Sequence, residues 1–263
     1  MPLRKLEPSF HERVWGTRNL NPWFPAAPRD TALPIGEVWF ETPEISLLVK
    51  FLFTSENLSV QVHPDDHYAQ LHHNSPGKTE MWHVLAAQEG AKIAAGFREP
   101  VTKEQVREAA LDGTIVDLLQ WFDAKVGDTF YIPAGTVHAI GAGLTICEIQ
   151  QPSDITYRLY DYGRGRELHL DRALAVSRLE PHAPRTDTKV LSPHFVTELL
   201  SVNTATKPLA SPGRELLIAI AGGGKIGGQP VHRGDVFLTV SPYTIENIDT
   251  LILMRTHLPA HRD

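Results

Sequence analysis

Residues 127–138 read Gly-Asp-Thr-Phe-Tyr-Ile-Pro-Ala-Gly-Thr-Val-His, and this stretch is the strongest indication of the fold class. The run from Asp128 to Ile132 is rich in β-branched and aromatic residues, which favour a strand. Pro133 and Gly135 then shape a tight turn, and the turn places His138 at the start of a new strand. Short strands joined by tight turns are typical of a β-sandwich or β-barrel.

Outward from this stretch, short strand-like runs recur along the chain between turn residues. They are Val38–Phe40, Ile45–Phe53, Leu58–His63, Met81–Ala86, Asp128–Ile132, Thr145–Ile149, Glu215–Ile220 and Asp235–Val240. Helical spacing occurs at about 101–122, where Thr102 and Gln105 form a capping box and Gly113 interrupts the apolar stripe, and at 168–179. The sequence therefore predicts a mainly β protein with a small helical insertion.

A weak internal repeat predicts two halves. Gly127-Asp128-Thr129-Phe130 resembles Gly234-Asp235-Val236-Phe237. The offset that leads from Gly127 to His138 leads from Gly234 to Ile245, so the second copy lacks this histidine. A loose, proline-containing stretch after residue 180 is the expected linker. The expected domains are residues 1–180, which carry the helical insertion, and residues 181–263, which carry no metal site.

The composition excludes several classes of protein. Of 263 residues, 42% are hydrophobic and 21% charged, the balance of a globular protein rather than a disordered one. The net charge is −6 and no basic stripe is visible, which argues against a general nucleic-acid binder; an anionic substrate would need a locally basic pocket. The single cysteine, Cys147, forms no intramolecular disulfide, and no apolar run approaches the ~18–20 residues of a membrane span. We therefore expect a soluble cytoplasmic protein that binds neither nucleic acid nor membrane.

One group of polar residues has the composition of a metal site. Gln61 and His63 are two apart and face the same way on a strand, Glu80 begins the next strand-like run, and His138 follows the turn described above. Two imidazoles, a carboxylate and an amide oxygen suit Zn²⁺, and also Mn²⁺, Fe²⁺ or Co²⁺. The alternative is a set of hydrogen-bonded residues at strand ends. The remaining histidines of this region are expected on the surface or in loops: His67, His72, His73 and His83.

Residues 127–138 resemble the second metal motif of cupin barrels, and four longer segments resemble class I mannose-6-phosphate isomerases of the short bacterial type. The segments are Leu58–Asp66, Gly77–Trp82, Ile132–Ile140 and Glu148–Asp161, and Arg13-Val14-Trp15-Gly16 also fits. The resemblance covers roughly residues 10–175. It implies two jelly-roll cupin barrels and one Zn²⁺ per chain, held by Gln61, His63, Glu80 and His138. It also implies interconversion of D-mannose 6-phosphate and D-fructose 6-phosphate through a cis-enediol.

The resemblance also implies a substrate pocket with Lys78, Glu148 and Arg158, lined by Ser59, with Asp154 nearby. Arg158 is suited to bind phosphate or to stabilise the negative intermediate, because arginine contacts anions in a planar, bidentate manner. Glu148 is the first candidate for the catalytic base. Lys78 and a pair formed by His63 and Asp154 are the other candidates. Cys147 should face away from Glu148 as a buried apolar residue.

Two other functions remain open at this point. The chain could be a different metal-dependent cupin enzyme, such as an Fe²⁺ dioxygenase, although Gln61 in place of a histidine weakens that interpretation. It could also be a cupin that binds a sugar phosphate without converting it. Relatives often carry an aromatic residue and a cysteine beside Trp82, where this sequence has Met81 and His83. The expected partner is a small sugar phosphate, and the expected state is a monomer or a weak homo-oligomer.

Overall fold

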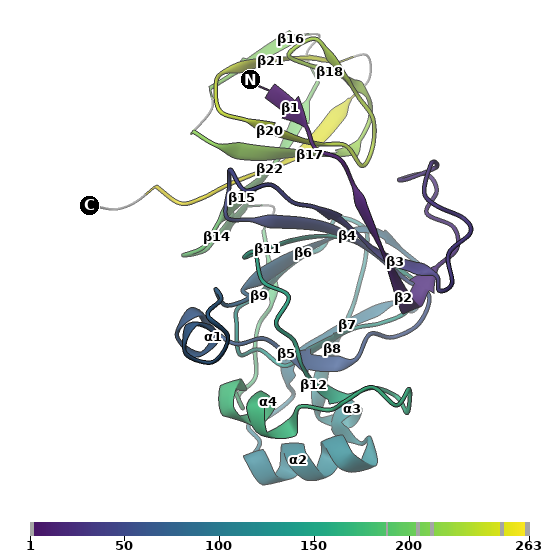
Figure 1. Ribbon diagram of the computed structural model, residues 1–263, viewed down its shortest axis with the longest axis vertical. Helices are drawn as coiled ribbons and strands as arrows, with labels where there is room; N and C mark the ends of the chain where they lie inside the picture. Colours follow the sequence, from purple (N-terminus) through teal and green to yellow (C-terminus); the bar gives the residue numbers. More distant parts are fainter. Residues whose placement is uncertain (1–2, 188, 204–205, 211–212, 248–249, 261–263) are drawn as a thin grey trace.

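The computed structural model describes residues 3–187, 189–203, 206–210, 213–247 and 250–260, and it consists of two antiparallel β-barrels. The barrels are stacked along the long axis of the molecule, and most of the helices gather at the far end of the larger one (Figure 1). Each of the eight predicted strand runs contains or overlaps a strand, so the mainly β prediction is confirmed. None of the helices in the described residues is long and apolar enough to cross a membrane.

The larger barrel is built from a seven-stranded and a five-stranded sheet. The first has the order β13 (Arg185–Thr186), β9 (Thr129–Ile132), β6 (Glu80–Ala87), β11 (Leu144–Gln150), β4 (Leu48–Thr54), β3 (Ile35–Phe40) and β2 (Ser9–Thr17). The second has the order β12 (Tyr157–Tyr160), β5 (Val60–Val62), β10 (His138–Ile140), β7 (Lys92–Phe97) and β8 (Leu119–Asp123). Trp82, Phe130 and Ile146 pack between the sheets as part of the barrel interior.

The smaller barrel pairs a six-stranded with a four-stranded sheet. The first has the order β1 (Leu3–Lys5), β20 (Val236–Thr239), β17 (Glu215–Ala221), β22 (Leu251–His257), β15 (Val196–Val202) and β14 (Lys189–Leu191). The second has the order β16 (Thr206–Leu209), β21 (Tyr243–Asn247), β18 (Gly224–Ile226) and β19 (Gln229–Val231). Its interior is apolar and includes Leu217, Phe237, Ile245 and Leu253.

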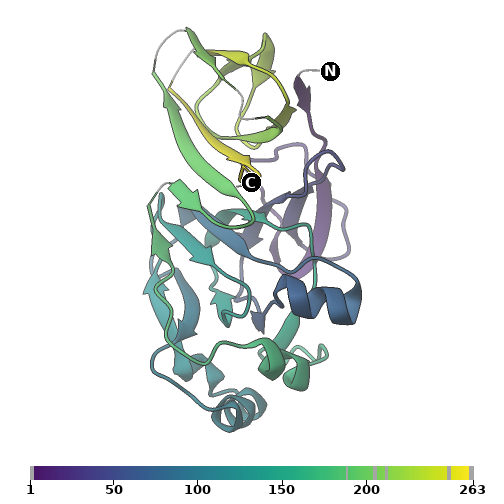
Figure 2. The same cartoon turned by 90° about the vertical axis from the view of Figure 1, so that its left-hand side faces the viewer.

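A third apolar cluster joins the two barrels. Phe51 and Cys147, on the outer face of the seven-stranded sheet, belong to the same buried cluster as Ile218 and Met254 of the six-stranded sheet. Figure 2 shows these sheets facing each other across the waist of the molecule. Cys147 is therefore buried at the contact between barrels and points away from Glu148, as predicted, because neighbours on a strand alternate between faces. Burial raises the pKa of its thiol.

The helices cover the outer face of the five-stranded sheet, apart from α1 (Asp66–His73), which precedes β6. The predicted capping box of Thr102 and Gln105 starts α2 (Lys103–Asp112), and Gly113 ends it with φ 88°. A short helix, α3 (Ile115–Leu118), follows. The helical prediction to residue 122 is wrong at its end, because residues 119–123 pair with β7 as strand β8. The second predicted helix is α4 (Leu170–Val176).

The two turns of the internal repeat have the same conformation. Gly127 and Gly234 have φ of 91° and 89°, in the left-handed region that glycine adopts readily. Their amides donate to Val84 O at 2.9 Å and Ala219 O at 2.8 Å. In each turn the aspartate that follows the glycine accepts from the amide three residues earlier, at 3.0 Å in the first and 2.9 Å in the second.

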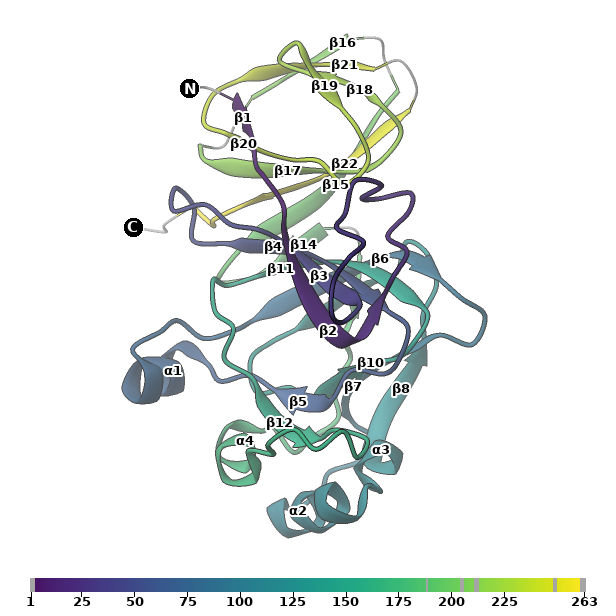
Figure 3. The same ribbon diagram turned by 45° about the vertical axis from the view of Figure 1, so that its right-hand side comes forward.

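The division of the chain near residue 180 stays a proposal, and two short strands cross it. Strand β1 belongs to the smaller barrel, where it pairs with β20, and Figure 3 shows the chain running from there to β2 of the larger barrel. Strand β13 follows residue 180 but pairs with β9 of the larger barrel.

Candidate active site

Three buried side chains meet inside the larger barrel. His63 follows β5, Glu80 is the first residue of β6 and His138 is the first residue of β10, and one nitrogen or oxygen from each lies within 4.8 Å of the others. Glu80 Oε2 lies 3.5 Å from His63 Nε2, and Glu80 Oε1 lies 3.4 Å from His138 Nε2. Gln61 is the register partner of His138, and its Nε2 lies 3.3 Å from His138 Nε2. The structure therefore brings together all four residues proposed as metal ligands.

The donor atoms of this cluster are oriented as a metal site requires. Nδ1 of His63 donates to Ile155 O, and Nδ1 of His138 donates to Thr136 O, each at 2.8 Å. Both Nε2 atoms are thereby directed to the cluster, in the way that main-chain carbonyls orient metal-bound histidines. Glu80 Oε1 is buried and has no hydrogen-bond partner in the described residues. Because amide O and N are assigned from their partners, a rotated Gln61 amide would offer its oxygen to the same point.

The electrostatics favour neutral imidazoles at this point. Burial lowers the pKa of His138 to about 3 and holds the pKa of His63 well below its usual value, where the Lys78 ammonium adds to the effect. Burial and the nearby carboxylate of Glu148 raise the pKa of Glu80 to about 7, against the opposing effect of Lys78. Neutral imidazole nitrogens with a carboxylate are the ligands that Zn²⁺ and similar ions bind in proteins.

A row of buried charges continues from Glu80 across the sheet. Lys78 Nζ contacts Glu80 Oε2, lies 3.1 Å from His63 Nε2 and lies 3.7 Å from Glu148 Oε1. Lys50 Nζ lies 3.5 Å from the same Glu148 oxygen. Burial lowers the pKa of Lys50, whereas the carboxylates of Glu148 and Glu80 outweigh burial and raise the pKa of Lys78. Two ammonium groups therefore flank one carboxylate beside the candidate metal site.

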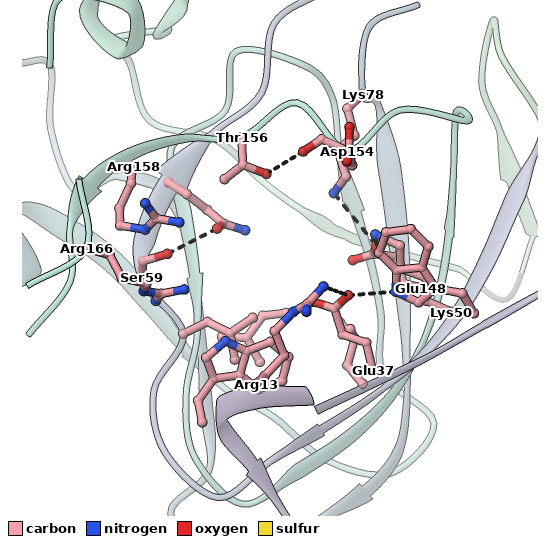
Figure 4. Close-up of a pocket in the computed structure, with 16 residues that line it drawn as sticks. Arg13, Glu37, Lys50, Ser59, Lys78, Glu148, Asp154, Thr156, Arg158 and Arg166 are labelled. Atoms are coloured by element: carbon pink, nitrogen blue, oxygen red, sulfur yellow. Dashed lines mark hydrogen bonds and ion pairs between the residues drawn. The ribbon is translucent and has the colours of Figure 1, made fainter. Parts of the chain in front are cut away.

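A cavity of about 410 Å³ opens next to this row. Figure 4 shows Arg158, Arg166 and Ser59 on one side of it and Lys50 and Glu148 on the other. Its lining includes five basic residues and three acidic ones: Arg13, Lys50, Lys78, Arg158 and Arg166 against Glu37, Glu148 and Asp154. The protein carries a net charge of −6, so this cavity is a locally basic pocket of the kind that an anionic substrate needs.

The predicted pocket residues differ in how closely they approach the cluster. Arg158 is the register partner of Gln61, and its buried Nε has no hydrogen-bond partner in the described residues. Ser59 Oγ donates to Gln61 Oε1 at 3.2 Å. Asp154 lines the cavity, but among the described residues its carboxylate makes no hydrogen bond or ion pair with His63, whose Nδ1 is taken by the Ile155 carbonyl.

One wall of the cavity was missed by sequence reasoning. Arg13 makes a bidentate ion pair with Glu37, at 3.1 and 2.9 Å, and Glu37 accepts from Trp39 Nε1 at 2.6 Å. The Lys50 ammonium lies 4.3 Å from the centre of the Trp39 ring. A signal for Lys50 was present, since it is the one charged residue within the apolar run Ile45–Phe53.

The expectation for His83 is wrong. This residue lies in β6, is 4% exposed and pairs through Nδ1 with Thr129 Oγ1 at 3.0 Å, and burial lowers its pKa to about 4. It faces Thr129 because the two residues are register partners on β6 and β9. His67, His72 and His73 are exposed on α1, as expected, and His73 Nε2 lies 2.5 Å from Tyr157 Oη.

The chain is similar to enzymes of one kind. It is 33% identical to a mannose-6-phosphate isomerase of Streptococcus mutans, over 95% of this chain and 92% of the relative. It is 36% identical to a probable mannose-6-phosphate isomerase of Bacillus subtilis, over 70% of each. A crystal structure of mannose 6-phosphate isomerase from Bacillus subtilis superposes with a TM-score of 0.87 at 25% identity, covering 98% of this chain and all of the other. No family model matches the chain.

Proposed function

Because the chain belongs to the mannose-6-phosphate isomerase family, we propose that it interconverts D-mannose 6-phosphate and D-fructose 6-phosphate with one Zn²⁺ per chain. The observation that supports this best is the buried Glu80 carboxylate, whose two oxygens lie 3.5 Å from His63 Nε2 and 3.4 Å from His138 Nε2. Its Oε1 lacks a hydrogen-bond partner in the described residues, and its neighbours Gln61 and Lys78 line the basic cavity. A buried carboxylate oxygen left without a partner is costly unless a cation completes it. The proposed reaction passes through a cis-enediol.

The proposed ligands of the ion are Gln61, His63, Glu80 and His138. When bound, Zn²⁺ supplies a Lewis acid for the oxygens on the two reacting carbons. Because the Nδ1 atoms of both histidines are held by main-chain carbonyls, the imidazoles keep their orientation without the ion. The chain thus presents a preorganised ligand set, which favours the binding of an ion of the right size.

Glu148 is the proposed base that moves the proton between C2 and C1. Trp82 Nε1 donates to Glu148 Oε2 at 2.9 Å and fixes the carboxylate, while Oε1 is buried without a hydrogen bond in the described residues. Glu148 lines the cavity, which brings its carboxylate next to the space that a sugar would occupy. Lys78 is the weaker candidate for the base because the neighbouring carboxylates raise its pKa and keep it a cation. As a cation it can stabilise negative charge that develops on the substrate.

Arg158 is proposed to bind the anionic substrate. Its register position opposite Gln61 places its backbone next to the ligand set, and its side chain lines the cavity. Its buried Nε has no hydrogen-bond partner in the described residues. Nη1 is held by the main-chain oxygen of Glu167 at 2.8 Å, which limits the directions in which the guanidinium can turn. A guanidinium fixed in this way contacts phosphate in a planar geometry that a lysine does not reproduce.

A coupled assay of mannose 6-phosphate conversion tests the proposal directly. We expect turnover by the purified protein, loss of turnover after chelation and recovery when Zn²⁺ is added back. Turnover restored only by Fe²⁺, or oxygen consumption, would instead indicate another kind of cupin enzyme. Binding of fructose 6-phosphate by zinc-loaded protein without turnover would indicate a sugar-phosphate-binding protein and would overturn the proposal.

A cytosolic location and a monomeric or weakly self-associating state belong to the same proposal. The first is supported by the single cysteine, which suits a reducing compartment. The second can be measured by light scattering coupled to gel filtration over a range of protein concentrations. A stable oligomer whose mass does not change on dilution would contradict it.

A further inference from the structure

Two side chains hold the segment of chain that leads into β6. Residues 77–79 are buried and come directly before the first residue of this strand. The amide of Gly77 donates to Asp66 Oδ1 at 2.8 Å, and the amide of Thr79 donates to Gln151 Oε1 at 2.9 Å. Buried amides need acceptors, and two of these three consecutive amides find theirs on a side chain.

Asp66 and Gln151 also bind each other. Gln151 Nε2 donates at 2.7 Å to the same Asp66 oxygen that accepts from Gly77. The main-chain amide of Gln151 donates to Thr79 O at 3.2 Å, so Gln151 contacts Thr79 through both its main chain and its side chain. Because Gln151 is 6% exposed, these hydrogen bonds lie in the interior, where water does not replace a lost partner.

The same segment lies tightly against the chain that precedes α1. The amide of Lys78 donates to Pro64 O at 3.0 Å. A Cβ atom on Gly77 would lie 2.5 Å from Asp65 C and 2.8 Å from Pro64 O, so only glycine permits this approach. Pro64 directly follows His63, a proposed ligand. The segment is therefore packed next to one proposed ligand and ends at another.

The position of this segment determines where two charged groups lie. Lys78 belongs to it and Glu80 follows it, and Lys78 Nζ contacts Glu80 Oε2 and lies 3.1 Å from His63 Nε2. A shift of the backbone before β6 would therefore move an ammonium group and a carboxylate of the site together. Asp66 and Gln151 do not themselves line the cavity, so they can affect the reaction only through this segment.

We propose that Asp66 and Gln151 are positioning residues, which hold the backbone of residues 77–79 and so fix Lys78 and Glu80 at the metal site. This inference rests on the proposed function, because it concerns the ion and the ammonium group assigned there. Groups that orient metal ligands from outside usually change metal affinity or activity about 10- to 100-fold when they are removed. One Asp66 oxygen accepts both hydrogen bonds, so the amide oxygen of an asparagine should replace it.

The test measures zinc affinity by competition with a chromogenic chelator, and turnover of mannose 6-phosphate by zinc-loaded protein. We expect Asp66→Ala and Gln151→Met each to weaken zinc binding and to lower kcat about 10- to 100-fold. Asp66→Asn should restore both values to within about threefold of the wild type, because it keeps the accepting oxygen.

The neighbouring aspartate supplies a matched control. Asp65 is the N-cap of α1, and its Oδ1 accepts from the amide of Tyr68 at 2.9 Å. Asp65→Ala removes this cap, so it should lower the Tm by a few degrees. Its side chain makes no hydrogen bond to residues 77–79 in the part of the chain that the structure describes. Zinc affinity and kcat should therefore stay within about threefold of the wild type.

The possible results distinguish this inference from the proposed function. Wild-type zinc affinity and turnover in Asp66→Ala and Gln151→Met would overturn the inference and leave the isomerase intact. Equal losses in Asp66→Ala and Asp65→Ala would mean that zinc binding depends on the stability of α1, and would also overturn it. If Gln151→Met fails to fold, the comparison of Asp66→Ala with Asp66→Asn decides, because the Asp66 side chain is 55% exposed and tolerates replacement. Zinc affinity that depends on these residues in a wild type without turnover would support the positioning role and reject the isomerase.

Discussion

The two barrels share a pattern of strand pairing and differ in the side chains at corresponding positions. Glu80 pairs with the residue five after Gly127, and Glu215 pairs with the residue five after Gly234. Glu215 of the smaller barrel therefore corresponds to Glu80. The same pairing relates two further positions: Glu148 corresponds to Arg255, and Lys50 corresponds to Glu198. Each barrel thus has a row of three charged residues, which is Glu80, Glu148 and Lys50 in the larger barrel and Glu215, Arg255 and Glu198 in the smaller one.

The two rows differ in what lies beside their charged side chains. In the larger barrel, Glu148 and Lys50 line a cavity, so their row opens on a space that a substrate can enter. In the smaller barrel, Arg255 contacts Glu215, lies 3.5 Å from Glu198 and donates to Ala210 O at 2.7 Å. Ile245 stands where His138 would be and packs in the apolar interior. An internal arginine thus neutralises the buried glutamate of the smaller barrel, whereas a metal ion and a substrate are proposed to bind at the corresponding row of the larger barrel.

The largest effect should come from the paired variants Glu80→Gln and Glu215→Gln. Glu80→Gln removes an anionic ligand, so we expect zinc content to fall and kcat/KM to drop by about 10³-fold or more. Glu215→Gln changes the corresponding residue of the other barrel, and the zinc content and KM of the folded protein should stay at wild-type values. Elemental analysis and the coupled assay measure both. Full zinc occupancy in Glu80→Gln would show that the larger barrel does not use this carboxylate for the ion.

The Glu148→Gln variant tests whether the charged row of the larger barrel contains the catalytic base. The amide has a similar shape but cannot accept a proton from carbon, so kcat should fall by about 10²- to 10⁴-fold with zinc content unchanged. Near-normal turnover in zinc-loaded Glu148→Gln would assign the proton transfer to another residue. Zinc content must be measured in the same sample, because Glu148 lies close to Glu80 through Lys78.

A smaller effect, on stability alone, is expected from variants in the charged row of the smaller barrel. Glu215 is 0% exposed, and Glu215→Gln leaves the partly exposed Glu198 as the carboxylate that lies beside Arg255 in the described residues. Breaking a buried pair in this way should lower the free energy of unfolding by about 3 kcal/mol, or the Tm by roughly 5–10 °C. Glu198→Gln is the control and should cost about 1 kcal/mol or less, since this pair is more exposed. Equal losses in the two variants would mean that Glu215 carries no special share of the network.

The candidate ligands could be found from the sequence because each lies beside a local signal. Gln61 and His63 alternate on one strand, and His138 follows a turn that Pro133 and Gly135 specify. The residues of the outer wall of the cavity have no such local signal in the sequence. Arg13 and Glu37 meet because β2 and β3 pair at a sheet edge, and Arg166 reaches the cavity because Asp161 holds it. His83 was misplaced for a related reason, since its burial depends on a strand that lies more than forty residues later in the chain.

The pairing of β1 with β20 has a consequence for the order of folding. Lys5 and Phe237 are register partners, although 232 positions separate them in the chain. During synthesis this edge of the smaller barrel can close only after strand β20 has been made, when the larger barrel has already left the ribosome. Contacts between residues so far apart in sequence slow folding, because the loop must close before any contact rewards it. Strand β1 is therefore made long before its partner, and its pairing with β20 is among the last contacts of the smaller barrel to form.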